Sequence, residues 1–197
     1  MLGLSDPGMH IWLRDTQSAT RKYRYSWDMS EPQDGVFVGV HTGLVNRLVC
    51  EAIDDGTIQE MQGYERIQQE VRYGVERSRI DLLLSNADGR QCFVEIKNVT
   101  AKDHKAYAIF PDAVTSRGQK HIRELMHMVQ SGQRAILFFC VQRNDVAAFR
   151  PAGEIDPRYA DYLRIAVANG VEVYAYKANV APNQIKLHQS IPVQISE

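Results

Sequence analysis

Residues 79–97, RIDLLLSNADGRQCFVEIK, decide the fold that this sequence predicts. Two apolar runs in this stretch are joined at residues 86–89, NADG. Asp-Gly between two apolar runs is a strong signal for a β-hairpin. The stretch therefore predicts two neighbouring antiparallel strands.

Acidic side chains gather on one face of this hairpin. Side chains alternate along a strand, so Glu95 and Lys97 point the same way, roughly 6 to 7 Å apart along the chain. Asp81, on the first strand, can face them. Two carboxylates in apolar surroundings repel each other unless a cation lies between them, and a divalent metal with oxygen ligands meets that need. The alternative is that Glu95 and Lys97 form a solvated pair on an edge strand.

The composition is that of an ordinary soluble protein. The 197 residues predict one domain of about 150 residues with a small appendage. No apolar run approaches the roughly 20 residues that span a bilayer, and the N-terminus lacks a charged segment followed by an apolar one. A cytoplasmic protein without membrane association is expected.

Cysteine content and charge exclude several classes of site. Cys50, Cys92 and Cys140 are isolated in apolar surroundings, which favours buried thiols over a disulfide framework or a zinc site. The formal net charge of −1 gives no overall attraction to nucleic acid. Any such binding must come from local clusters of cations.

One such cluster lies in the first 42 residues, where short strands are expected at 10–13, 23–27 and 36–40. Residues 21–27, RKYRYSW, interleave Arg21, Lys22 and Arg24 with aromatic rings. This pattern suits phosphate contacts combined with base stacking. A strand with its aromatics inward and its cations solvated explains the pattern equally well.

A helix is expected over residues 43–54, where apolar side chains form one broad face and Gly56 follows as a stop. Glu51 falls at the margin of that face, from which it could reach a metal site on the sheet beneath. An exposed ion pair between Glu51 and Arg47 is the alternative.

Arginines also flank the acidic hairpin. A half-polar strand is expected over residues 65–73, and Gly74 turns the chain into the strand of Asp81. Arg77 and Arg79 then lie beside the acidic site. They hold phosphates, or they balance Glu76 and Asp81.

A second basic group opens the next helix. Residues 100–114 predict a loop of about fifteen residues, a length typical of functional or mobile loops. Ser116 and Gln119 resemble a capping box, and the helix ends at Gly132. Free amides at its N-terminus, with Arg117, Lys120 and His121, make a phosphate clamp. Gln119 either has a functional role or serves only as the partner of Ser116 in the capping box.

The remaining segments complete an α/β pattern. Residues 134–142 predict a strand buried on both faces, 159–169 a helix and 171–176 another strand. An edge strand is possible at 184–188. The order of elements indicates a sheet of mixed direction.

Two sets of residues resemble known families. Asp81 and Glu95-x-Lys97 on the next strand, followed by a helix and a buried strand, resemble the PD-(D/E)XK nuclease core. The blocks GVERSRID (74–81), FPDAVTxRGQKH (110–121) and GVEVxAY (170–176) resemble the sugar fermentation stimulation protein A (SfsA) family. The similarity covers nearly the whole chain.

The resemblance implies a fold and a site. It implies a PD-(D/E)XK, restriction-endonuclease-like mixed sheet flanked by helices at residues 43–197, preceded by a partial OB-like β segment at 1–42 that lacks the first OB strands. It also implies that Asp81 and Glu95 hold Mg²⁺ (or Mn²⁺), that Lys97 orients or activates the attacking water, and that Glu51 adds an outer-shell or second-metal contact.

Two functions follow from the resemblance. The first is a sequence-tolerant, metal-dependent nuclease acting on DNA. The second is a non-catalytic DNA-binding regulatory protein linked to sugar (maltose) metabolism. The complete set of Asp81, Glu95 and Lys97 favours the nuclease, because a pure DNA-binding protein has no need for all three. A protein-interaction module fits less well, and a homodimer is left open.

Overall fold

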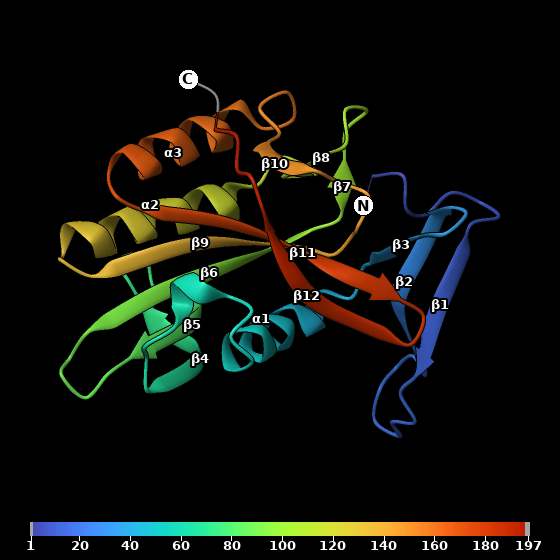
Figure 1. Ribbon diagram of the computed structural model, residues 1–197, viewed down its shortest axis with the longest axis horizontal. Coiled ribbons are helices and arrows are strands. Elements are labelled where there is room, and N and C mark those ends of the chain that lie inside the picture. Colours follow the sequence, from blue (N-terminus) through green and yellow to red (C-terminus); the bar gives the residue numbers. More distant parts are fainter. Residues whose placement is uncertain (1, 196–197) are drawn as a thin grey trace.

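The computed structural model describes residues 2–195, in which three sheets and three α-helices form a mixed α/β fold (Figure 1). A three-stranded antiparallel sheet comes first in the chain, in the order β1-β2-β3. Its strands are β1 (His10–Asp15), β2 (Tyr25–Gln33) and β3 (Val36–Gly39). The three short strands expected before residue 42 are confirmed, although β2 extends further along the chain than expected.

The main sheet has six strands in the order β12-β11-β9-β6-β5-β4. β4, β5 and β6 pair antiparallel, β6, β9 and β11 pair parallel, and β12 is antiparallel to β11. The mixed direction is as the sequence predicts. The strands are β4 (Arg66–Tyr73), β5 (Ser78–Ser85), β6 (Gln91–Val99), β9 (Arg134–Val141), β11 (Glu172–Ala181) and β12 (Gln184–Ile191).

Helices cover both faces of this sheet. α2 (Ser116–Gln130) and α3 (Pro157–Ala168) pack on one face, and α1 (Val45–Asp54) packs on the other (Figure 1). Single 3-10 turns, η1 (Thr42–Leu44) and η2 (Gln59–Met61), flank α1. No helix within residues 2–195 is long and apolar enough to cross a bilayer.

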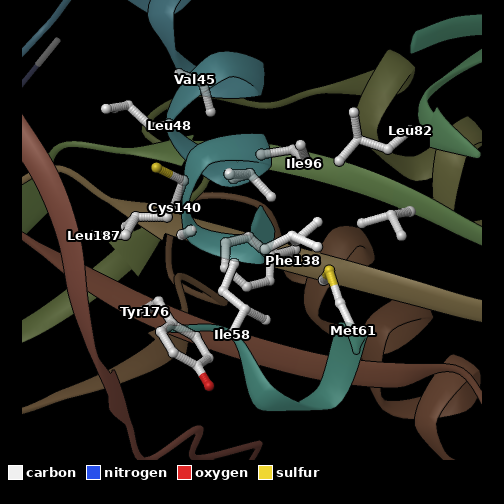
Figure 2. Close-up of a cluster of buried hydrophobic side chains, with 14 of the residues drawn as sticks. Val45, Leu48, Ile58, Met61, Leu82, Ile96, Phe138, Cys140, Tyr176 and Leu187 are labelled. Atoms are coloured by element: carbon white, nitrogen blue, oxygen red, sulfur yellow. The ribbon is translucent and has the colours of Figure 1, made fainter. Parts of the chain in front are cut away.

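Alternating side chains of the strands supply two separate cores, as expected for a sheet buried on both faces. On the α1 side, Leu82, Ile96 and Phe138 of the strands belong to the same buried cluster as Leu48 of α1 (Figure 2). Other strand residues, such as Phe93, Leu137 and Phe139, form the core beneath α2 and α3. Cys92 and Cys140 are fully buried free thiols, as expected, whereas the free thiol of Cys50 is only half-buried.

The expected loop over residues 100–114 is wrong. It contains β7 (Ala101–Lys102) and β8 (Tyr107–Phe110), which form a small sheet with β10 (Ala148–Pro151) in the order β10-β8-β7. These strands have two to four residues, too few to show alternation. Their pairing with a segment about forty residues away leaves no local signal in the sequence.

The cap of α2 also differs from the expectation. Thr115, not Ser116, is the N-cap, and its Oγ1 accepts a hydrogen bond from the Gly118 amide at 2.9 Å. Gln119 is not a cap partner, because its Nε2 donates to both carboxylate oxygens of Asp156 at 3.0 Å. Asp156 in turn caps α3, so one buried carboxylate ties the starts of the two helices together.

Candidate metal centre

The site lies where β5 and β6 separate. The antiparallel ladder between them runs from Ser85 opposite Gln91 to Leu82 opposite Val94. Beyond this pair the backbone pairing between the two strands ends. The Ile96 amide donates its hydrogen bond to Oδ2 of Asp81 instead, at 2.7 Å. Asp81 is therefore held in the gap between the two strands.

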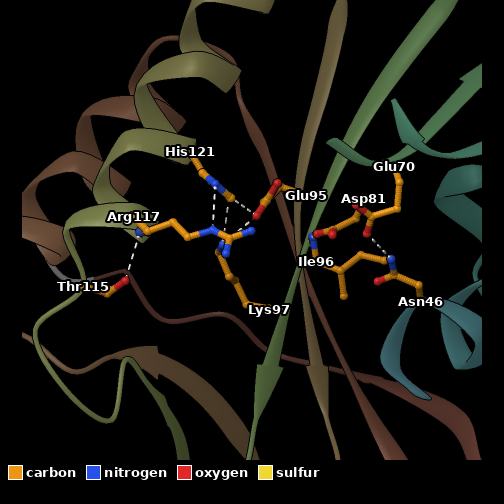
Figure 3. Close-up of polar contacts among 10 residues, drawn as sticks. Asn46, Glu70, Asp81, Glu95, Ile96, Lys97, Thr115, Arg117 and His121 are labelled. Carbon is orange, nitrogen blue, oxygen red and sulfur yellow. Dashed lines mark hydrogen bonds and ion pairs between the residues drawn. The ribbon is translucent and has the colours of Figure 1, made fainter. Parts of the chain in front are cut away.

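Glu95 faces α2 and is 2% exposed. Its Oε1 accepts a hydrogen bond from Lys97 Nζ at 2.6 Å and is also bound to Nδ1 of His121, which comes from α2 (Figure 3). Its Oε2 is buried and has no hydrogen-bond partner among the described residues. A buried carboxylate oxygen without a partner is costly unless a ligand satisfies it.

The two carboxylates differ in their electrostatics. Burial, followed by the negative charge of Glu95, raises the pKa of Asp81 from 3.8 to about 6. Burial also tends to raise the pKa of Glu95, but the hydrogen bond to His121 and the charge of Lys97 outweigh it and lower that pKa. Near neutral pH both groups are therefore largely ionised, and Asp81 lacks a sufficient counter-charge.

This donor set fits a hard cation with few protein ligands. Among the described residues, no three His, Cys, Asp or Glu side chains converge as a metal-binding group. Mg²⁺ needs no such cage, because it keeps several waters and binds one or two carboxylates together with substrate phosphates. Asp81 and the free Oε2 of Glu95 could supply such carboxylate ligands.

The structure brings Glu95 and Lys97 together on one face, as expected from the alternation of side chains. Asp81 points differently from the expectation. In Figure 3 its side chain lies beside Asn46 and Glu70, whereas Glu95 lies beside His121 and Lys97. Glu70 has a positive φ of 57° within β4, and alternation alone does not predict such an irregularity opposite Asp81.

The structure does not bring Glu51 to this site. Its carboxylate lies 3.3 Å from Arg47 Nε, and both side chains are more than half exposed. The exposed ion pair, weighed above as the alternative, is what the structure contains. From α1 it is Asn46 that reaches inward, donating from Nδ2 to Glu70 Oε1 at 3.4 Å.

His121 has a different place from the expected surface clamp. It is 5% exposed and contacts Glu95, and its Nε2 accepts from Arg117 Nε at 3.4 Å. Sequence reasoning missed this contact, although a signal was present. His121 lies four residues before Leu125 on the buried stripe of the helix, so it had to point toward the sheet.

The other basic residues near the site have varied partners. Lys120 Nζ donates to the Glu76 carbonyl at 2.6 Å. Arg79 Nη1 lies 3.6 Å from Glu70, at an exposed position, and not against Asp81. Arg77 is exposed, and the part of the chain described by the structure offers it no hydrogen bond or ion pair.

In the loop between β1 and β2, Arg24 forms an ion pair with Asp15 at 2.6 Å, and Arg21 donates to Ser26. The Lys22 ammonium lies 5.2 Å from the centre of the Tyr23 ring. Tyr23 is 70% exposed, so the alternative in which the aromatics point inward does not hold for this ring.

Known proteins with similar sequences share one family description. Residues 43–184 match the family described as the sugar fermentation stimulation protein RE domain. The sugar fermentation stimulation protein homolog of Geobacter metallireducens is 54% identical over 193 residues, which cover 98% of this chain and 82% of the relative. The homolog of Shewanella sp. (strain MR-4) is 45% identical over 190 residues, covering 96% of this chain and 80% of the relative.

A solved structure, that of Pyrococcus furiosus SfsA in complex with Ca²⁺, is also similar. It superposes with a TM-score of 0.87 at 29% identity, covering 96% of this chain and 80% of the relative. The family match spans β4, β5, β6, β9 and β11 of the main sheet and all three α-helices, and the relatives match over nearly the full chain. The chain therefore belongs to the sugar fermentation stimulation protein (SfsA) family.

Proposed function

We propose that this protein is a metal-dependent hydrolase of DNA phosphodiester bonds, with Mg²⁺ or Mn²⁺ held by Asp81 and Glu95. The observation that carries the proposal is the buried carboxylate of Glu95 together with the partly buried carboxylate of Asp81. Glu95 has a free Oε2, and burial, followed by the negative charge of Glu95, raises the pKa of Asp81 to about 6. Perturbed carboxylates of this kind are typical of functional sites.

The comparisons support the proposal at a coarser level. The matched RE domain is restriction-endonuclease-like, which suggests nuclease-like DNA binding. The Pyrococcus relative was solved with Ca²⁺, which suggests that a divalent metal binds in this family. We extend both to this chain, and with them the PD-(D/E)XK description of residues 43–197 and the OB-like description of 1–42.

Each residue of the centre has a role in this proposal. A bound metal ion would stabilise charge on the scissile phosphate and generate hydroxide near neutral pH. Asp81 and Glu95 provide its carboxylate oxygens. His121 holds Oε1 of Glu95, and Oε2, which has no partner among the described residues, would be available to the ion. Lys97, 2.6 Å from Oε1, places a positive charge beside the phosphate and orients the attacking water.

DNA would be held by cations outside the centre. These cations lie in three places. The β4–β5 turn and β5 carry Arg77 and Arg79, and the first turns of α2 carry Arg117 and Lys120. The loop between β1 and β2 carries Arg21, Lys22 and Arg24. These groups provide phosphate contacts, which carry affinity but little sequence information. His121 is assigned to Glu95 instead, because it is buried.

The test separates metal binding from chemistry. Calorimetric Mg²⁺ titration should show binding by the parent and by Glu51→Ala, the matched control, and none by Asp81→Ala. Cleavage of single- and double-stranded DNA should require Mg²⁺ or Mn²⁺ and stop in EDTA. Lys97→Ala should keep its Mg²⁺ affinity while cleavage falls at least a hundredfold, the scale seen when one charge-stabilising group is removed.

Two results would contradict the proposal. Full metal binding by Asp81→Ala would place the metal elsewhere. DNA binding by the parent without cleavage under any metal would favour the non-catalytic regulatory function.

A further inference from the structure

Two arginines without partners lie at the end of β4 and in the turn that leads to β5. Arg72 and Arg77, together with Tyr73 and Gly74, line a hollow of about 600 Å³. Both arginines are exposed, and neither has a hydrogen bond or ion pair within residues 2–195. Most other arginines of the described chain pair with a carboxylate. This hollow is therefore a place of uncompensated positive charge.

The arrangement is unfavourable for the hairpin itself. Arg72 is directly opposite Arg79 in the β4–β5 register, and like charges at such positions destabilise a pair of strands. Arg77 has a positive φ of 53°, a region that a non-glycine residue adopts at some cost in free energy. An anion bound at the hollow would offset the repulsion.

Helix α2 fixes this turn firmly. The carboxylate of Glu124, 1% exposed, accepts hydrogen bonds from the amides of Val75 at 3.1 Å and Glu76 at 2.6 Å. Lys120 donates to the Glu76 carbonyl at 2.6 Å. At Gly74 any Cβ atom would lie 2.1 Å from Glu124 Oε2, so a larger residue would displace the carboxylate. The arginines thus project from a rigid support.

The same helix and strands connect the hollow to the metal centre. α2 carries both Glu124, which holds the turn, and His121, which holds Glu95. Arg79 precedes Asp81 by two residues on β5, a separation of roughly 6 to 7 Å. The position of the turn relative to the metal centre is therefore set by packed elements.

We propose that Arg72 and Arg77 form a phosphate-binding subsite for the DNA strand beside the scissile phosphate, with Glu124 as its positioning residue. The proposal rests on the proposed function for the identity of its ligand. The planar guanidinium group forms paired hydrogen bonds with phosphate oxygens. The subsite holds the backbone near the metal centre without reading bases.

The test measures binding of a fluorescent duplex DNA in EDTA, where no turnover occurs, over a series of salt concentrations. Arg72→Ala/Arg77→Ala should lower affinity at least tenfold. The slope of log affinity against log salt should become shallower by about two, one unit for each lost phosphate contact. The Mg²⁺ affinity should not change, and the melting temperature should not fall, because the repulsion between Arg72 and Arg79 is removed.

Arg66→Ala is the matched control. Arg66 lies on the same strand, is exposed and has no hydrogen bond or ion pair among the described residues, but it is six residues, roughly 20 Å, from Arg72. Its removal should change affinity less than twofold. Equal effects of Arg66→Ala and of either arginine in the hollow would overturn the subsite.

Glu124→Gln tests the positioning role. The amide keeps one acceptor oxygen but presents an NH₂ group to the other turn amide, so the turn should loosen and DNA affinity fall threefold to tenfold. Its Mg²⁺ affinity should stay at the parent value. Unchanged DNA affinity, or an equal loss of Mg²⁺ affinity, would overturn the role.

The outcomes separate this inference from the proposed function. If the parent binds duplex but cleaves under no metal, hydrolysis is wrong, and a loss of binding in the double variant still supports the subsite. If the parent cleaves and the double variant binds as the control does, the subsite is wrong and the function stands. If the parent binds no DNA, both are wrong.

Discussion

At the scale of single residues, the carboxylate of Asp81 is ionised at neutral pH, although its surroundings favour the protonated form. Its pKa is about 6 in the folded protein, against 3.8 as the reference value. A carboxyl group whose pKa is raised by folding stabilises the fold when protonated, below about pH 4. This stabilisation is lost as the pH rises through about 6. Metal-free protein should therefore be weakened by Asp81 at pH 7.5.

Asp81→Asn should relieve this cost. The amide oxygen can still accept the hydrogen bond from the Ile96 backbone, so this bond is kept while the charge is removed. In EDTA at pH 7.5 we expect the free energy of unfolding to rise by about 1 to 2 kcal/mol, a two-unit shift reduced for partial exposure. The difference should shrink at pH 4.5, where the parent carboxyl is protonated.

Urea unfolding at the two pH values measures this, with Glu51→Gln as an exposed control that should change little. Excess Mg²⁺ should reverse the order, because only the parent gains stability from binding. A variant that is less stable than its parent at both pH values would contradict the raised pKa.

At the scale of secondary-structure elements, Asp156 connects the starts of α2 and α3. Its Oδ1 accepts from the Tyr159 amide at 2.9 Å, and its Oδ2 accepts from the Thr115 amide at 2.9 Å. Burial alone raises the pKa of Asp156, but the hydrogen bonds from these amides and from Gln119 lower it, so the carboxylate is ionised and stabilising at neutral pH.

Asp156→Ala should cost about 3 to 4 kcal/mol in the free energy of unfolding, because it removes a helix cap and leaves buried donors unpaired. Asp161→Ala, which removes an exposed partner of Arg164 on α3, should cost less than about 1 kcal/mol. Urea unfolding compares the two. Similar losses for both variants would mean that Asp156 has no special role in joining the helices.

The elements that could be predicted from the sequence are those with a local signal. The hairpin at residues 86–89, the apolar face of α1 and the buried strand β9 are all determined by nearby residues. The strands β7, β8 and β10 could not be predicted, because they depend on pairing between distant segments. The same holds for Gln119. The nearby sequence predicts that it is a cap partner, whereas in the structure its side chain forms a tertiary hydrogen bond with Asp156.

The candidate site also contains a feature that could be predicted from the sequence and features that could not. The alternation of Glu95 and Lys97 is a property of one strand, so it could be predicted. The direction of Asp81 depends on an irregularity where β4, β5 and β6 meet, and the exposed position of Glu51 depends on how α1 packs. Neither can be read from the spacing of residues along the chain.

At the scale of the whole molecule, the N-terminal sheet is joined to the main body through β3. The Gly39 amide donates to the Gln142 carbonyl at 2.9 Å, and a Cβ atom at Gly39 would lie against the Gln142 side chain. The net charge of −1 provides no general attraction to DNA. The division into parts at residues 42 and 43, and the homodimer left open above, stay predictions.

The exposed aromatic rings where the β1–β2 loop meets β2 predict a difference between the binding of single-stranded and of double-stranded DNA. Tyr23 is 70% exposed and Tyr25 is 52% exposed, and cations lie over both rings. Unpaired bases can stack on such rings, with about 1 to 3 kcal/mol per base, whereas bases within a duplex are already stacked. Tyr23→Ala/Tyr25→Ala should therefore weaken single-strand binding at least tenfold and leave duplex binding within about twofold.

Fluorescence anisotropy with a single strand and its matching duplex measures both affinities over a salt series. The salt slope should stay at the parent value, because no charge is removed. Arg21→Ala/Lys22→Ala is the complementary control, since it should make the slope shallower for either substrate. Equal losses for both substrates in the tyrosine variant would assign these rings to the structure of the sheet and exclude base stacking.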